Sequence, residues 1–240
     1  RPRAIEGSYM PCFLAGESQG RGIAAAQCIP FYAHSHQQGH LAAAAWSAGR
    51  LELLDSPFLA WHLSGGTTEL LLVKPENYTV SAEIIGGTSD LSAGQLIDRT
   101  GVLLGLQFPA GKALDELCAQ ADVVSEPHVK LKDLTFSLSG MENQVKALWE
   151  KGEPPAKIAR FALDAVFHIV LRATQEAQRR YPGLPVLCSG GVASNSRLRV
   201  ELKALCGAIF AEPGYATDNA MGTAILTWRA LEAARREGSR

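Results

Sequence analysis

Two kinds of signature are missing from this sequence: paired cysteines and long apolar runs. None of the five cysteines forms a CxxC pair with another. Neither a zinc ribbon nor a disulfide framework is therefore indicated, and reduced thiols are the simplest expectation. No apolar run reaches membrane-spanning length, and the first residues do not resemble a signal peptide. We expect a cytoplasmic protein without a membrane partner. An initiating Met is missing too, and we expect Arg1-Pro2-Arg3 to be a start partway through a longer, N-terminally truncated protein.

A large excess of one charge is also absent. Lys and Arg together number 23 and Asp and Glu 24, which gives a formal net charge of −1. Proteins that grip nucleic acid unaided usually carry a basic surplus, so RNA binding here would need a local basic patch or a basic partner. The hydrophobic share of 47% over 240 residues is enough for a sizeable core.

The order of the expected elements predicts an α/β fold. A helix is expected over residues 36–54, followed by a three-stranded meander between residues 58 and 87 with a Gly-Gly turn after its first strand. Helices and strands then alternate to residue 238, which is typical of a layered α/β domain. A boundary between two lobes is expected near residues 53–58.

The stretch "HSHQQGH" contains three histidines within seven residues. His36 and His40 are four residues apart, so on a helix their side chains rise from one face and could grip one metal ion. Zinc proteases of the HExxH type carry a Glu general base directly after the first His, but here that residue is Gln37. The alternative is that His34 and His36 are polar loop residues and that His40 packs under the helix.

Two glycine pairs follow apolar strands. "LSGGTTE" contains Gly65 and Gly66, and "CSGGVASN" contains Gly190 and Gly191. Glycines let backbone N–H groups approach an anion, and two such turns with hydroxyl neighbours suggest a phosphate-bearing ligand in a cleft. Neither turn matches a P-loop or a Rossmann motif, and each alone could be a simple turn.

Two aspartates have alternative interpretations. Asp218, in "ATDNA", could cap the closing helix or supply an oxygen ligand to the histidine pair. Asp98, in "GQLIDR", could be a solvated surface charge or could accept hydrogen bonds from ribose hydroxyls.

These motifs occur in an order that resembles the tRNA N6-adenosine threonylcarbamoyltransferase family, whose older label is O-sialoglycoprotein endopeptidase or glycoprotease. Several motifs in one order are far more specific than any single one. The motifs that carry the resemblance are "SHQQGH", "SGGTTEL", "AGQLIDRTGVLLGLQFPAG", "FSLSG", "SGGVASNSRLR" and "ATDNA".

The resemblance implies an actin/Hsp70-like ATPase fold (the ASKHA, RNase H-like class) with two lobes around a cleft and with its first lobe incomplete. Residues 1–57 would be the C-terminal part of the first lobe, carrying the histidine motif. Residues 58–240 would be the nucleotide-binding second lobe. The implied reaction moves threonylcarbamoyl from its adenylate to N6 of adenosine 37 in tRNA. The implied partners are tRNA, a paralogous dimerisation protein and other tRNA-modification subunits.

The resemblance also implies site residues. One divalent metal, iron or zinc, would be held by His36, His40 and Asp218. ATP, AMP or an acyl-adenylate would be bound by eight residues: Ser64, Gly65, Gly66, Asp98, Gly111, Gly190, Gly191 and Asn195.

The chain departs from the family pattern at several positions. Gln38 and Gln95 replace Glu, Thr67 replaces His, Arg99 replaces Lys, and Glu142 replaces Lys. These changes indicate a divergent paralogue and leave open a catalytically degenerate nucleotide-binding or scaffold protein of the same fold. A metallopeptidase is a further alternative, disfavoured by Gln37.

Overall fold

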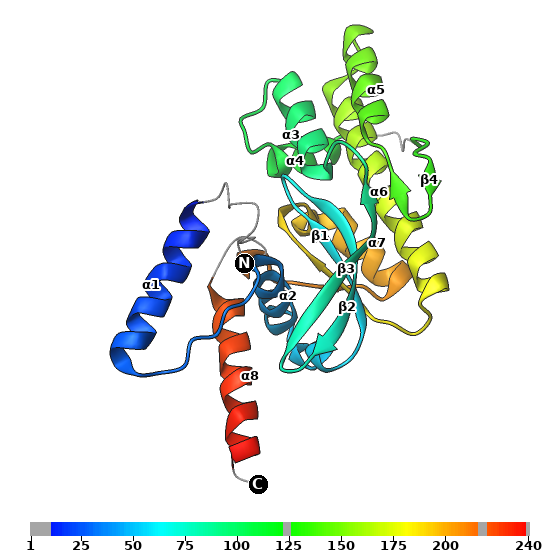
Figure 1. The fold of residues 1–240 in the computed structure, drawn as a ribbon. Coiled ribbons are helices and arrows are strands. Elements are labelled where there is room, and N and C mark those ends of the chain that lie inside the picture. Colours follow the sequence, from blue (N-terminus) through cyan, green and yellow to red (C-terminus); the bar gives the residue numbers. More distant parts are fainter. Residues whose placement is uncertain (1–10, 122–125, 216–219, 239–240) are drawn as a thin grey trace.

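The structure is a computed structural model that describes residues 11–121, 126–215 and 220–238. Its centre is a mixed sheet, which within these ranges has seven strands in the order β4-β5-β3-β2-β1-β6-β7 (Figure 1). The strands are β1 (Phe58–Leu63), β2 (Thr68–Glu76), β3 (Thr79–Thr88), β4 (Leu131–Lys132), β5 (Thr135–Phe136), β6 (Val186–Ser189) and β7 (Ile209–Phe210).

The strand directions confirm the predicted actin/Hsp70-like α/β fold. β1, β2 and β3 form the expected antiparallel meander, in which Leu63 pairs with Thr68 across the first turn. β6 and β7 then run parallel to β1 on its other side. The loops that follow β1 and β6 therefore meet at one edge of the sheet, where α/β proteins usually bind ligands.

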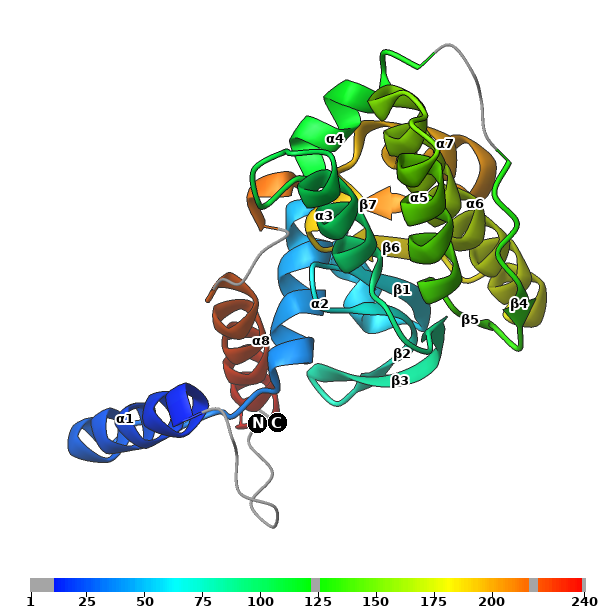
Figure 2. The same cartoon turned by 90° about the horizontal axis from the view of Figure 1, so that it is seen from above.

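Helices cover both faces of the sheet (Figure 2). α2 and α8 pack on one face, and α3 to α7 lie on the other, with α6 spanning most of it. The helices are α1 (Pro11–Gln27), α2 (His36–Ser47), α3 (Ala93–Leu103), α4 (Gly111–Cys118), α5 (Ser139–Glu150), α6 (Pro155–Arg180), α7 (Ser196–Cys206) and α8 (Met221–Gly238).

Strand β1 supplies side chains to two separate cores. Phe58 and Ala60 pack against α2 and α8, whereas Leu59, Trp61 and Leu63 face the helices of the opposite layer. This follows from the period of two along a strand, and a central strand covered on both faces reads as a nearly continuous apolar run. The indole of Trp61 is buried, and its N–H donates a hydrogen bond to Thr174 Oγ1 at 2.9 Å.

α2 and α8 cross at a contact between two glycines. A Cβ added to Gly222 would lie 1.7 Å from the carbonyl oxygen of Gly39, so only glycine permits this approach. Gly39 lies between His36 and His40, and the start of α8 is thereby held against the histidine segment. Because α2 packs on the sheet, the predicted division into 1–57 and 58–240 is not visible as a gap and stays a prediction.

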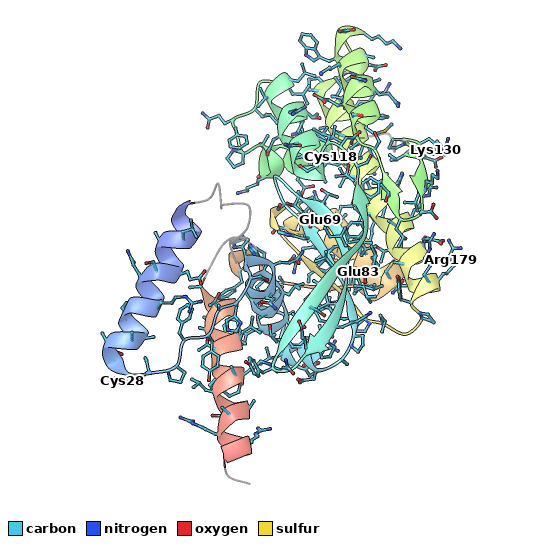
Figure 3. All side chains as sticks on the ribbon, viewed as in Figure 1. Cys28, Glu69, Glu83, Cys118, Lys130 and Arg179 are labelled. Atoms are coloured by element: carbon cyan, nitrogen blue, oxygen red, sulfur yellow. The ribbon has the colours of Figure 1, made fainter. Side chains whose placement is uncertain are left out.

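The cysteines that the structure describes in full are free thiols. Figure 3 shows Cys28 at the far end of α1, outside the layers, and Cys118 among the helices of the main body. Cys188 and Cys206 are buried. Burial raises the pKa of the Cys118 and Cys206 thiols, which keeps them protonated at neutral pH. None of the helices in the described ranges combines the length and the apolar character needed to cross a bilayer.

Candidate functional site

A cavity of about 530 Å³ opens at the edge of the sheet where the loops after β1 and β6 meet. Its volume lies within the range of small-molecule sites. Five of the eight residues predicted to contact a nucleotide line it, whereas Ser64, Gly66 and Gly190 do not. The five are Gly65, Asp98, Gly111, Gly191 and Asn195.

The turn after β1 is closed by its own serine. Ser64 N–H donates to the Thr67 carbonyl at 2.8 Å, and Thr67 N–H donates to Ser64 Oγ at 3.0 Å. Gly65 and Gly66 are therefore held at the exposed tip. A Cβ at either glycine would meet no atom within 4 Å, so the turn presents bare backbone to open space.

Helix α3 begins directly against this turn. A Cβ on Gly94 would lie 2.5 Å from Gly65 Cα, and Ser92 Oγ donates to the Gly65 carbonyl at 2.7 Å. Ser92 also caps α3 by accepting from Gln95 N–H, while Gln95 Oε1 accepts from Ser92 N–H. The N-terminus of a helix thus stands beside a glycine turn, which is favourable for binding an anion.

Asp98 is not a freely solvated surface charge. It is half-buried, and its Oδ1 accepts from Ala110 N–H at 2.8 Å, which holds the turn between Pro109 and Gly111 over the cavity. A carboxylate has lone pairs beyond this one bond, so its capacity to accept from a ribose hydroxyl is compatible with the geometry.

The second glycine pair has divided roles. Gly190 has φ +96°, and a Cβ there would lie 2.2 Å from the Leu63 carbonyl oxygen, so this glycine allows β6 to pack against β1. Gly191 lines the cavity, and a Cβ on it would meet nothing within 4 Å. Asn195 caps α7 through Oδ1, which accepts from Leu198 N–H at 2.9 Å.

Asp115 is a cavity-lining residue that the sequence analysis missed. Its Oδ2 accepts from Ser196 Oγ at 2.9 Å, which ties α4 to the start of α7. Its spacing of four residues from Gly111 was the available signal, because both then lie on one face of α4.

The predicted metal ligands His36 and His40 do meet. Their Nε2 atoms are 3.0 Å apart, and their rings stand at 88° to each other. Two nitrogens bound to one tetrahedral zinc ion would be roughly 3.4 Å apart, given the usual zinc–nitrogen distance. The pair therefore fits a divalent ion with little adjustment, and imidazole suits zinc and iron. His34 is not part of this pair; its Nε2 lies 3.3 Å from Thr227 Oγ1 on α8.

The third predicted ligand, Asp218, lies outside the described residues. Within the described ranges, no group of three or more His, Cys, Asp or Glu side chains is placed to hold one metal ion. The metal site therefore stays a prediction for this chain.

One further polar residue, His62, lies beside the histidine pair, and Glu69 is its neighbour on the next strand; the sequence analysis missed both. The ring of His62, on β1, has its centroid 5.2 Å from that of His40. Glu69 is the cross-strand partner of His62 on β2, and burial raises the pKa of its carboxyl group. The alternation along β1 was the signal for His62, since it follows Ala60 by two residues on the face that α2 covers.

Gln38, which replaces the family's Glu, has a structural role. Its Oε1 accepts from Ser35 N–H and its Nε2 donates to the Val80 carbonyl, both at 2.8 Å. A carboxylate could not make the second bond. Gln38 and Gln95 thus occupy the same position in two helix-capping boxes, and neither replacement by itself indicates lost chemistry.

The solved structures most informative about the fold are two HypF proteins. This chain is 16% identical to full-length HypF in its phosphate- and nucleotide-bound form, with a TM-score of 0.64 over 85% of this chain and 44% of that one. HypF from T. kodakarensis is 14% identical, with a TM-score of 0.62 over 90% of this chain and 39% of that one. At these identities the likeness shows a shared fold alone.

The sequence comparisons are more specific. A tRNA N6-adenosine threonylcarbamoyltransferase of Streptococcus thermophilus is 35% identical over 214 residues, which are 83% of this chain and 61% of that protein. The Thermus thermophilus protein of the same name is 35% identical over 224 residues, which are 90% of this chain and 66% of that protein. The chain thus spans under two thirds of the length of these relatives. Residues 7–225 match the TsaD profile, and the chain belongs to the tRNA N6-adenosine threonylcarbamoyltransferase family.

Proposed function

We propose that the cavity binds the adenylate of a threonylcarbamoyl donor and that the chain takes part in transferring this group to N6 of an adenosine in tRNA. The observation that carries the proposal is the gathering of Gly65, Asp98, Gly111, Gly191 and Asn195, from four separate segments, around one cavity. In the reaction the adenosine nitrogen forms a bond to the carbamoyl carbon. The bond from that carbon to the AMP phosphate oxygen breaks, and AMP and a proton leave.

The chain's own residues would bind and orient the donor. The bare backbone at Gly65 and Gly191 gives a phosphate close access to main-chain donors beside the N-termini of α3 and α7. Asp98 would accept hydrogen bonds from the ribose while it holds the 109–111 turn in place. Because these groups are fixed by hydrogen bonds within the protein, they need no reorganisation when the AMP phosphate departs.

We propose that His36, His40 and Asp218 hold one iron or zinc ion. One support is the close approach of the two imidazoles. The other is the contact between Gly222, which is four residues after Asp218, and Gly39, which lies between the two histidines in the sequence. Such an ion, when bound, would polarise the carbamoyl carbonyl. A metallopeptidase remains less favoured because Gln37 offers no general base.

We also propose a cytoplasmic setting with partners. The chain's net charge of −1 favours a basic companion in tRNA binding, in line with the paralogous dimerisation protein and other modification subunits that we expect.

Isothermal titration with AMP tests the nucleotide site. Gly191→Leu should fill the cavity and weaken AMP binding at least tenfold, because its Cβ starts in open space at the cavity wall. Gly140→Leu is the matched control, since a Cβ on Gly140 also meets nothing within 4 Å but lies in α5 away from this cavity. Equal AMP affinity in all three proteins, or no AMP binding by the parent chain, would refute the proposal.

Metal analysis separates the transferase from the degenerate scaffold. The purified chain should carry about one iron or zinc, and His40→Ala should lose it while AMP binding persists. A metal-free parent chain that binds AMP would favour the scaffold.

A further inference from the structure

The outermost strand of the sheet, β4, lies beside a hollow of about 430 Å³ on the flank of α6, which we call the β4–α6 hollow. Figure 3 shows Lys130, just before β4, and Arg179, on α6, at the same margin of the molecule. The hollow and the nucleotide cavity share no lining residue, so the two are separate. Residues that line the hollow include Leu131, Asp133, Arg172, Gln175, Arg179 and Arg180.

β4 has an open edge. It pairs with β5 on one side, and no strand within the described ranges lies on its other side. Phe136, the partner of Leu131 on β5, turns its carbonyl away from β4, because that oxygen accepts from Ser89 N–H. Leu131 and Phe136 therefore form a non-hydrogen-bonded pair, and the Leu131 N–H and C=O point to the open edge. An edge of this kind can pair with a further extended chain.

The extended segment is longer than β4 itself. Between residues 127 and 132, covered and exposed side chains alternate, and Lys130 and Lys132 take exposed positions. This period of two is that of a strand. Arg172 Nη1 donates to the Val129 carbonyl at 2.7 Å, which ties the segment to α6. The segment with which a partner would pair is therefore already fixed in position.

Cations without a counter-charge surround this edge. Among the residues that the structure describes, Lys130, Lys132 and Arg172 form no ion pair. The two acids that line the hollow already pair with Arg180. The surface therefore favours a partner with negative charge. Five basic and three acidic residues leave a formal charge of +2 over residues 126–134 and 169–180.

We propose that the β4–α6 hollow binds an acidic peptide segment of a partner protein, in extended form, as a strand added to β4. The backbone of the peptide would pair with the Leu131 N–H and C=O. Successive side chains of a strand point to opposite faces. Those on the outer face would meet Lys130 and Lys132, and those on the other face would meet Arg172 and Arg179. Consecutive Asp or Glu residues therefore fit this surface better than an alternating pattern.

A peptide accounts for both the open edge and the charge. A nucleic acid would supply negative charge, but its backbone cannot continue the hydrogen-bonding pattern of a sheet. None of the described residues that line the hollow is aromatic, so the hollow offers no ring on which an unpaired base would stack. The proposed contact is independent of the nucleotide site, because no residue of the hollow lines that cavity.

Fluorescence anisotropy of a short labelled peptide, with a central run of glutamates flanked by valines, tests the proposal on the full chain. The parent chain should bind this peptide. Combining Lys130→Glu with Lys132→Glu should weaken binding at least tenfold, because two attractive charges become repulsive. The control combines Lys151→Glu with Lys203→Glu, which changes the net charge equally at two exposed lysines that do not line the hollow. This control should leave the affinity unchanged.

A second peptide separates strand addition from charge attraction alone. Methylation of every backbone N–H in the glutamate run keeps the charge but removes the donors, and should weaken binding at least tenfold. Equal affinity for the methylated peptide, equal affinity in the Lys130 and Lys132 variant, or no binding by the parent chain would overturn the proposal. A single-stranded oligonucleotide of equal charge that binds more tightly than the peptide, and loses affinity in the same variant, would assign the surface to nucleic acid and overturn it too.

Discussion

Arg99 on α3 and Glu142 on α5 form an ion pair, with Nη1 3.2 Å from Oε2. These are two of the positions at which the chain departs from the family motifs, where both residues are Lys. The acid at position 142 thus meets the cation at position 99 between α3 and α5. Glu142 therefore has structural partners, and its presence does not by itself indicate lost chemistry.

Reversing the charge at position 142 should destabilise the fold modestly. Glu142→Lys would place a third cation beside Arg99 and Lys146, and we expect a loss of about 1 kcal/mol in the free energy of unfolding, reduced by added salt. Urea unfolding at low and high salt measures it. Adding Arg99→Glu in the same chain should recover part of the loss, whereas strictly additive effects would mean that the pair contributes nothing.

Restoring the family's residue at position 38 should cost stability. Gln38→Glu keeps the capping acceptor but sets a carboxylate against the Val80 carbonyl, and we expect a loss of about 1–2 kcal/mol at neutral pH. Gln95→Glu is the matched control, since Gln95 is exposed and an acidic group in the first turn of a helix is favourable. Thermal unfolding followed by circular dichroism measures both, and equal melting temperatures would contradict the assigned role of Gln38.

The buried carboxylate of Asp164 should be among the most sensitive positions in the chain. It is fully buried and accepts from Arg160 Nε at 3.0 Å and from Arg197 Nη1. Asp164→Ala would remove the counter-charge of the half-buried Arg160 and would leave Arg197 only its outer partner, Glu201, at an expected cost of about 3–5 kcal/mol. Glu201→Ala removes only the outer partner of Arg197 and should cost about 0.5 kcal/mol. Chemical unfolding of both variants measures the two losses in the free energy of unfolding. Equal losses would contradict the special role of Asp164.

Asp90 should make stability depend on acid pH. Burial opposes its ionisation, but donors from Ser137, Ser139 and the Leu91 and Leu138 amides outweigh it and hold the pKa of this carboxyl well below its usual range. In the unfolded chain the same group titrates at about 3.9. Its stabilisation is therefore fully present above pH 5 and is lost as the pH falls below about 4, because only the unfolded chain then takes up the proton.

Asp90→Asn provides the comparison for that pH dependence. It should reduce the free energy of unfolding on the order of 1 kcal/mol at pH 7, and the gap to the parent chain should narrow at pH 3. Urea unfolding across this range measures the gap. A difference that stays constant with pH would show that Asp90 titrates normally in the folded protein.

The family, the α/β class and the meander could all be predicted from the order of residues in the chain. Several spaced motifs in one order are not a chance pattern, and the apolar run "FLAWHL" followed by a Gly-Gly turn predicts a central strand from local rules alone. The proximity of His36 and His40 was predictable for the same reason, because residues four apart on a helix share a face.

The partners of these residues, in contrast, depend on how distant segments pack together. The sequence leaves open whether Gln38 marks lost chemistry, whereas in the folded chain its amide donates to the Val80 carbonyl, 42 residues away. Asp98 likewise accepts from the Ala110 N–H, which the sequence does not indicate. The position of His62 beside His40 depends on how α2 lies on the sheet. Periodicity and turn propensity act over a few residues and can be read from a sequence. The hydrogen bonds and cavities that make a site join segments far apart in the chain, and packing alone sets their distances.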